Sequence, residues 1–293
     1  MAIKKAGKCK ARPESKILKR IMKINLIIRG GLGNQIFQYA LATSLRNQGH
    51  EVRLDTSMYD MVKMHNGYEL DRVFGINDPI ITKGGLHLLK LRLLHKFRPS
   101  SLYLTDTGTY NPDLLTSPKK YINGYWQDER YFKDVEPSLR QALTFAGIDP
   151  QNQSIAEEMK KVESVSFHLR RGDYSAYGMT LLGEDYYKKA VSTILERTSD
   201  PVFYIFSDDK EAAEAMAKNV GIRYRLMGHN RGDSSYKDMY LMSNCKHNII
   251  ANSSFSWWGA WLNANKSKVV TAPQVWDSKH PEYHPQLKDW ILL

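Results

Sequence analysis

VESVSFHLRRGDY, residues 162–174, joins an apolar run to a cluster of charged side chains. The run from Val162 to Phe167 has the length and composition of a buried strand. The following segment, His168 to Tyr174, brings a histidine, two arginines and an aspartate to the carboxyl end of that strand. Ligands bind at this end of the strands in open parallel sheets, so the stretch predicts both a central strand and a ligand site.

The adjacent residues Arg170 and Arg171 favour an anionic ligand. A guanidinium group is planar, always charged and matched in shape to two phosphate oxygens. The alternative for such a pair is a solvated turn with two surface arginines. The strands and helices around the pair favour the anion site.

Strand and helix patterns alternate regularly through the second half of the chain. The predicted strands are 164–167, 202–206, 222–226, 247–251 and 268–272. The predicted helices are 154–161, 184–196, 211–218, 235–242 and one that starts near Ser253. This alternation is typical of a parallel sheet with helices on both faces.

The first half opens with a β-α-β unit: a strand at 23–29, a helix from Asn34, and a strand at 51–55. The turn between the first two, Gly30 to Gly33, lets backbone N–H groups approach an anion at the helix N-terminus. A tight strand-to-helix turn without a ligand is the alternative.

A dinucleotide fingerprint is only partly present in this unit. Gly31 and Gly33 match the G-x-G-x-x-G pattern, and Asp55 ends the second strand as a ribose-binding acid would. Ile36 stands where the third glycine is needed. A nicotinamide-dependent oxidoreductase therefore stays open as a rival reading.

Residues 56–145 are less regular, with short strands expected at 80–82, 102–104 and 121–123. Residues 85–97 form a basic, leucine-rich helix that either packs on a sheet or contacts a membrane surface. Residues 124–132 mix aromatic and polar side chains, including Tyr125, Trp126 and Gln127. Such a loop either lines a sugar site or caps a core.

Two further strand ends carry polar clusters. Asp208 and Asp209 either cap the next helix or accept hydrogen bonds from a nucleobase or a ribose. Residues 252–261 place several serines at a helix start, which suits a phosphate, and include three tryptophans that we expect to pack in the core.

The charge is concentrated at the N-terminus. The chain has a formal net charge of +11, but residues 1–21 hold eight Lys/Arg and one Glu. The rest is mildly basic and shows no nucleic-acid-binding signature. We interpret residues 1–21 as a disordered basic leader, with membrane tethering as the alternative. The two cysteines do not suggest a disulfide scaffold, so a reducing, cytoplasmic location fits.

Motifs for metal-dependent chemistry are missing from the sequence. No two aspartates stand two residues apart, and there is no H-E-x-x-H, Walker loop or G-x-S-x-G elbow. We therefore expect no metal and no resident cofactor. The linker signal at residues 147–152 divides the chain into domains 22–150 and 151–293.

Together these motifs resemble those of the bacterial α-1,2-fucosyltransferases, glycosyltransferase family 11. The resemblance covers about residues 22–270 and is most specific at His168 to Tyr174. The other motifs occur in the family's order, namely Gly31 to Gln35, Gly124 to Gln127, Phe206 to Asp209 and Asn252 to Trp257.

The resemblance implies an α/β fold of the GT-B type, in which two Rossmann-like domains with parallel sheets face each other across a cleft. The C-terminal domain would hold GDP-fucose and the N-terminal domain would face a β-galactoside acceptor such as lactose or a glycan repeat. Fucose would be transferred to O2 of galactose with inversion. A non-catalytic glycan-binding protein is a further rival reading.

The resemblance also implies roles for individual residues. Arg170 would neutralise the departing diphosphate, and Asp208 or Asp209 would hold the guanine. Asp173 would be either the catalytic base or an ion-pair partner of Arg170 or Arg171. The expected donor-binding residues are Asn34, Gln35, His168, Arg170, Arg171, Asp208, Asp209, Ser253, Ser254, Phe255 and Ser256. The expected acceptor-side residues are Tyr125, Trp126 and Gln127.

Overall fold

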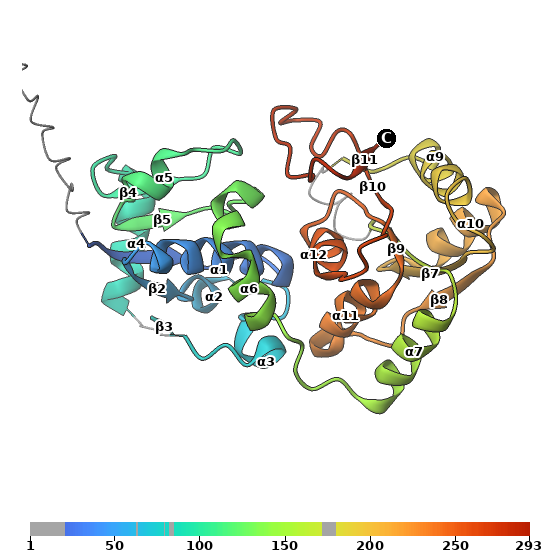
Figure 1. Cartoon of the computed structure of the whole chain (residues 1–293). Helices are drawn as coiled ribbons and strands as arrows, with labels where there is room; N and C mark the ends of the chain where they lie inside the picture. The colour runs from blue at the N-terminus through green and yellow to red at the C-terminus, as the bar shows by residue number, and fades with distance from the viewer. Residues whose placement is uncertain (1–20, 63, 79, 82–84, 172–179) are drawn as a thin grey trace, which may run out of the picture.

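The computed structural model describes residues 21–62, 64–78, 80–81, 85–171 and 180–293. These residues form two α/β halves, each built on one sheet (Figure 1). Every strand pair in both sheets is parallel. The sheet type predicted from the strand–helix alternation is therefore confirmed.

The first half holds a five-stranded sheet of order β3-β2-β1-β5-β4. Its strands are β1 (Lys23–Ile27), β2 (Glu51–Asp55), β3 (Ile80–Ile81), β4 (Tyr103–Thr105) and β5 (Tyr121–Asn123). Its helices are α1 (Leu32–Asn47), α2 (Met58–Met61), α3 (Leu70–Phe74), α4 (Gly85–Phe97), α5 (Asp113–Thr116) and α6 (Glu136–Ala142), with 3-10 turns η1 (Glu129–Tyr131) and η2 (Lys133–Val135). The predicted opening unit corresponds to β1, α1 and β2.

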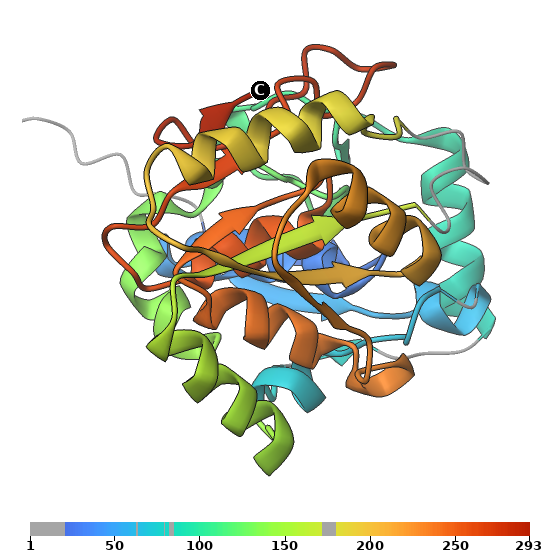
Figure 2. The same ribbon diagram turned by 90° about the vertical axis from the view of Figure 1, so that its right-hand side faces the viewer.

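The second half holds a six-stranded sheet of order β11-β10-β9-β6-β7-β8. Its strands are β6 (Ser164–Leu169), β7 (Val202–Ser207), β8 (Tyr224–Met227), β9 (His247–Ile249), β10 (Val270–Ala272) and β11 (Ile291–Leu292). Its helices are α7 (Pro150–Lys161), α9 (Glu184–Leu195), α10 (Lys210–Val220), α11 (Tyr236–Asn244) and α12 (Ser254–Leu262), with the 3-10 turn η3 (Gly232–Ser234). Figure 2 shows α9 on one face of this sheet and α7 and α11 on the other.

Strand β6 lies at the centre of the second sheet, and all six of its residues are buried. Its sequence, SVSFHL, alternates small or polar side chains with apolar ones, and both kinds are buried at this central position. Strand β11 is a difference from the sequence-based expectation, which placed the last strand at 268–272. It pairs with β10 through Thr271 and Ile291 and extends the sheet by one strand.

The chain passes from the first half to the second between α6 and α7, close to the linker signal at 147–152. Asp149 caps α7 by accepting a hydrogen bond from the Asn152 N–H at 3.0 Å. Leu139 of α6 packs with the first half, whereas Ile155 and Met159 of α7 pack under the second sheet.

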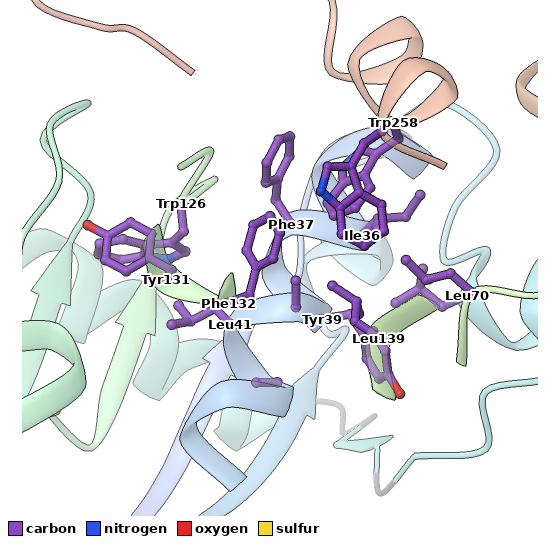
Figure 3. Close-up of a cluster of buried hydrophobic side chains, with 14 of the residues drawn as sticks. Ile36, Phe37, Tyr39, Leu41, Leu70, Trp126, Tyr131, Phe132, Leu139 and Trp258 are labelled. Carbon is purple, nitrogen blue, oxygen red and sulfur yellow. The ribbon is translucent and has the colours of Figure 1, made fainter. Parts of the chain in front are cut away.

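Helices α1 and α12 join the two halves through an aromatic contact that we call the seam (Figure 3). The Phe37 ring centroid lies 4.6 Å from that of Trp257 and 4.8 Å from that of Trp258. Phe132 stacks on Trp258 at 5.5 Å. The largest apolar cluster contains residues from both sides of the predicted domain boundary. The expectation that the tryptophans of α12 pack in the core is confirmed, because Trp257, Trp258 and Trp261 are buried.

Candidate functional site

A cleft of about 1,020 Å³ lies between the two halves. The carboxyl ends of β6 and β7, the segment after β8 and the first turn of α12 form its wall in the second half. Segments 30–34, 64–69 and 125–127 contribute to its wall in the first half. The cleft is therefore where the sequence predicted it, at the carboxyl ends of parallel strands.

Arg170 enters the cleft beside Asp208. Its Nη1 lies 3.0 Å from Asp208 Oδ2, and each side chain is about one quarter exposed, at 27% and 24%. Asp208 Oδ1 also accepts the Arg171 backbone N–H at 3.0 Å. The register that pairs Leu169 with Ser207 brings the two strand ends together. Asp208 thus orients Arg170 and Arg171, which we call the arginine loop; the sequence analysis considered this role for Asp173 and not for Asp208.

Asp173 lies outside the described residues. Arg171 is described, but it does not line the cleft. Its side chain leaves Nε without a hydrogen-bond partner among the described residues.

His168 is buried in the cleft wall. Burial, and secondly the positive charge of Arg170, lower its pKa to about 3, so the ring is neutral at neutral pH. Its Nδ1 has no hydrogen-bond partner among the described residues. A neutral imidazole with a free ring nitrogen can donate to or accept from a polar ligand group.

Asp209 does not line the cleft. Its carboxylate accepts the Ala212 N–H at 3.0 Å and caps α10. This geometry matches the capping alternative that the sequence offered for this position.

The first turns of α1 and α12 meet at the cleft. A Cβ atom built on Gly33 would lie 2.6 Å from the Ser254 carbonyl carbon, so only glycine permits this approach. Ser253, Ser254 and Phe255 line the cleft, and Ser253 caps α12 by accepting the Phe255 N–H at 3.3 Å. The positive ends of two helix dipoles therefore face one cavity.

Ser256 is placed differently from expectation. It is buried, and its hydroxyl donates to the carbonyls of Ala251 and Ser253 at 3.5 and 3.3 Å. Its hydroxyl is thus turned back onto carbonyl groups at the start of α12, and Ser256 does not line the cleft.

Gln35 also differs from the expectation that it reaches the cleft. It is fully buried, and its Nε2 donates to the carbonyls of Gly30 and Gly67 at 3.1 and 2.8 Å. Its Oε1 accepts the Glu69 N–H at 2.9 Å. Gln35 therefore ties together two segments that form the cleft wall, and Asn34 is the residue that lines the cavity.

The loop at 125–127 is split between cleft and core. Tyr125 and Gln127 line the cleft, but Trp126 is buried against Tyr131 (Figure 3). Asp106 Oδ2 accepts the N–H groups of Tyr125 and Trp126 at 3.0 and 2.8 Å. This contact holds Trp126 at the positive φ of 55°, which is costly for a bulky residue and fixes the direction of its neighbours.

A hydrogen-bond chain crosses the cleft near this loop. Tyr283 donates to Gln127 Oε1, and Gln127 Nε2 donates to Asn34 Oδ1. Tyr283 comes from the segment between β10 and β11, which the sequence analysis did not assign. Its contribution is visible only after the chain has folded back across the cleft.

Asp238 of α11 is a second cleft residue that the sequence did not reveal. The half-buried residue lines the cavity, and removal of its carboxyl group from water raises the pKa to about 7. Its Oδ1 accepts Asn230 Nδ2 at 2.7 Å. The sequence around it reads as an ordinary amphipathic helix, so nothing distinguishes this aspartate from a surface residue.

Asp238 is the cleft end of a polar network. Asn230 also donates to Asn152 Oδ1 at 2.9 Å, and Asn152 donates to Asp149 Oδ2 at 2.8 Å. Asp149 in turn pairs with Lys237 at 2.8 Å. This Lys237 contact and the hydrogen bonds from Asn152 hold the pKa of Asp149 below its usual range. Asn230 fixes one oxygen of the Asp238 carboxyl group, and the group borders the cavity. Asp238 is therefore suited to accept hydrogen bonds from a ligand.

Asp55 does not reach the cleft, so it cannot serve there as the ribose-binding acid of a dinucleotide site. Asp55 is fully buried away from the cleft and accepts hydrogen bonds from His87 Nε2 at 2.8 Å and the Ser57 N–H at 3.2 Å. Ile36 is buried in the apolar cluster that contains the seam, where a glycine would leave a void.

Within the described ranges, no group of three or more His, Cys, Asp or Glu side chains could hold a metal ion. No helix in the described part of the chain is long and apolar enough to cross a membrane.

Comparison with known proteins identifies related sequences. The model of the family described as Glycosyl transferase family 11 matches residues 109–293. The alpha-1,2-colitosyltransferase of Escherichia coli is 32% identical over 282 residues, covering 91% of this chain and 97% of the relative. The O-antigen biosynthesis glycosyltransferase WbnK of E. coli is 30% identical, covering 91% and 99%. The galactoside 2-alpha-L-fucosyltransferase Sec1 of Mus musculus is 30% identical, covering 90% and 72%.

Two solved structures share the fold. Fucosyltransferase NodZ from Bradyrhizobium superposes with a TM-score of 0.50 at 13% identity, covering 82% of this chain and 92% of NodZ. Arabidopsis thaliana FUT1, solved in complex with GDP, gives a TM-score of 0.51 at 12% identity, covering 92% and 71%. The two-domain GT-B architecture expected from the sequence motifs is confirmed.

Proposed function

This chain belongs to glycosyl transferase family 11, and on that premise we propose that it transfers L-fucose from GDP-β-L-fucose to O2 of a terminal β-galactoside. The galactose O2 attacks C1 of fucose, and the bond from C1 to the β-phosphate oxygen breaks. Its electron pair leaves with GDP, and the configuration at C1 inverts to α.

The convergence of positive groups at one cleft carries this proposal. Arg170, held by Asp208, and the first turns of α1 and α12 face the same cavity. As the bond to fucose lengthens, negative charge develops on the diphosphate. Fixed donors and dipoles stabilise that charge without having to reorganise, which lowers the barrier. Lys210 and Arg231 line the cleft as further cations.

The hydroxyl proton of galactose needs an acceptor. Asp173 is our candidate for the base, as the resemblance of the His168 to Tyr174 motif implies. The alternative role for Asp173 was an ion pair with Arg170 or Arg171, and Asp208 already makes the ion pair with Arg170.

Asp238 is our candidate for recognition of the guanine. An ionised carboxylate can accept two adjacent N–H donors from the guanine edge. Asp209 is engaged in capping and Asp208 in orienting Arg170, so neither presents an uncommitted carboxylate to the cleft. Asp238 does line the cleft and uses one oxygen for Asn230. The buried, neutral His168 is suited to contact the nucleotide from the neighbouring strand end.

The acceptor side is formed by Tyr125, Gln127 and Asn34 of the first half. Galactose hydroxyls would meet the amide groups of Gln127 and Asn34, and the Tyr125 ring offers an aromatic face. Arg29 lies 4.9 Å from the centroid of that ring and restricts its position.

Colitose is the second candidate for the transferred sugar, since one relative at 32% identity is named a colitosyltransferase. Colitose lacks the hydroxyl that fucose carries at C3. A site that hydrogen-bonds this hydroxyl would reject colitose, whereas an apolar site would accept both.

We expect the reaction to need no metal. We also propose a cytoplasmic location, since the buried Cys245 forms no disulfide and therefore fits a reducing compartment.

The test is to incubate the protein with GDP-fucose or GDP-colitose and a panel of β-galactosides, and to analyse the product linkage by mass spectrometry. An α-1,2-linked fucosyl product is expected. Transfer from GDP-colitose alone would replace fucose as the donor sugar, and a different linkage or no transfer from either donor would refute the proposed reaction.

A further inference from the structure

Helix α4 presents a row of large apolar side chains to solvent. Leu86, Leu89, Leu93 and Phe97 are 87%, 53%, 47% and 69% exposed. Their spacing of three, four and four residues places them on one face, because an α-helix turns once every 3.6 residues. Single exposed leucines are ordinary on protein surfaces, but a continuous row marks an interaction surface. We call these four residues the α4 row.

The α4 row takes no part in holding the helix to the domain. A different face of α4 does so, through buried Leu91 and the partly buried Leu94, which pack with Ile27, Tyr103 and Tyr121. Figures 1 and 2 show α4 at the periphery of the first half, and none of the described helices or strands lies over its outer side. The row is therefore available to a partner.

Positive charge borders the row. The sequence has no Asp or Glu between Asp78 and Asp106. At 100° per residue, Lys90 and Lys96 fall on opposite sides of the row. The exposed basic residues of this segment are Lys90, Arg92, Lys96 and Arg98. An apolar strip between cations is complementary to a surface that offers hydrocarbon beneath negative charge.

We propose that the α4 row docks on the surface of an anionic lipid bilayer. Leu86, Leu89, Leu93 and Phe97 would enter the boundary between headgroups and acyl chains, and the flanking lysines would meet lipid phosphates. The inference does not depend on the transferred sugar or on the acceptor, since it concerns a surface outside the cleft.

A second copy of the chain fits this surface less well. The helix has 13 residues and is about 20 Å long, and the row is one side chain wide. It cannot supply the roughly 800 Å² that each partner buries in a standard interface. A symmetric contact through α4 would also bring like charges together, and α4 itself contains no acidic residue to pair them.

The test is co-sedimentation of the full chain with vesicles. One set consists of phosphatidylcholine alone, and the other contains about one third phosphatidylglycerol. We expect binding to the anionic set that weakens as salt is added. The variant with Leu86, Leu89, Leu93 and Phe97 all changed to serine should bind at least tenfold less, while keeping its thermal stability and its turnover of a soluble galactoside. Leu195→Ser is the matched control, because Leu195 is 52% exposed but lies in the second half.

Each other outcome overturns the proposal. If the fourfold serine variant binds the anionic vesicles as the parent does, attraction resides elsewhere, for example in the basic residues 1–21. If the parent binds neither vesicle set, the row does not dock on lipid. If light scattering shows that the parent is a dimer and the fourfold serine variant is a monomer, the row is a self-association surface. None of these results bears on transfer from GDP-fucose, which the soluble assay measures separately.

Discussion

Changing Asp238 to asparagine is expected to weaken GDP binding and to remove the preference for GDP over IDP. The substitution keeps the shape of the side chain and leaves one oxygen to accept the hydrogen bond from Asn230. It replaces the second acceptor oxygen with an amide that donates. The N–H groups of guanine would then face another donor.

The size of the effect follows from the charge of the lost acceptor. A hydrogen bond to a charged group contributes about 1.5–3 kcal/mol. The dissociation constant for GDP should therefore rise about 10- to 150-fold. IDP lacks the N2 amino group of guanine, so the parent should bind it about 1 kcal/mol or more less tightly, which is at least about fivefold. In Asp238→Asn the ratio of the dissociation constant for IDP to that for GDP should approach one.

The pH dependence provides a second measurement. The raised pKa of about 7 means that the free carboxyl group is protonated in mild acid. GDP affinity of the parent should fall about tenfold per pH unit below that value, because the ionised form is the acceptor. The affinity of the asparagine variant should not follow this curve.

Folding stability should respond in the opposite sense. The folded protein holds the Asp238 proton more tightly than the unfolded chain, whose aspartates titrate near 3.9. The contribution of this residue to stability is therefore complete below about pH 3.9 and is lost as the pH rises through 7. Without ligand, Asp238→Asn should melt no earlier than the parent at pH 8.

Isothermal titration with GDP and IDP at several pH values, combined with thermal melting, measures all of these quantities. Asp200→Asn is the control, since Asp200 is 80% exposed and pairs with Arg223. If Asp238→Asn binds GDP with the parent's affinity and the parent's ratio to IDP, Asp238 does not read the base. If the same change in Asp208 or Asp209 removes the ratio instead, the base is read there.

Four other outcomes are expected. Arg170→Ala should lower kcat by about 10²–10³ with little change in melting temperature, and Arg170→Lys should recover little, as an ammonium group cannot bridge two oxygens; near-normal turnover of the lysine variant would contradict this role. Activity should persist in EDTA, and a requirement that only added Mg²⁺ or Mn²⁺ restores would contradict metal independence. Gly33→Ala should cost about 1–3 kcal/mol, measured by urea unfolding, because its Cβ meets the Ser254 backbone; an unchanged midpoint would show that the helices separate freely. Asp209→Ala should lower stability by about 1 kcal/mol through loss of the α10 cap and leave the GDP/IDP ratio intact, as paired melting and titration would show.

The fold was predictable because its signals are local. Strand β6 carries Val165, Phe167 and Leu169 at every second position, as strands do, and the helices that follow carry their own periodicity. The arginine loop was predictable for the same reason, because a strand fixes where its carboxyl end points. Strand β11 has only two residues and is defined by its pairing with β10, so no local pattern marks it.

The direction of individual side chains was less predictable, because it depends on partners far away in the sequence. Gln35 turns from the cleft toward Gly67, and Trp126 turns toward the core because Asp106 holds the backbone before it. Asp238 becomes a cleft residue through Asn230, whose own partner Asn152 is 78 residues away. A motif locates such residues near a site without stating which of them face it.

The seam has a consequence for exchanging parts between relatives. Phe37 and Phe132 come from the first half, whereas Trp257 and Trp258 come from the second half. A chimera that grafts a relative's second half onto this first half inherits only one side of that aromatic packing. New sugar specificity should therefore come in a stable protein only when the recipient's α1 is redesigned together with the incoming α12, with the glycine at position 33 kept.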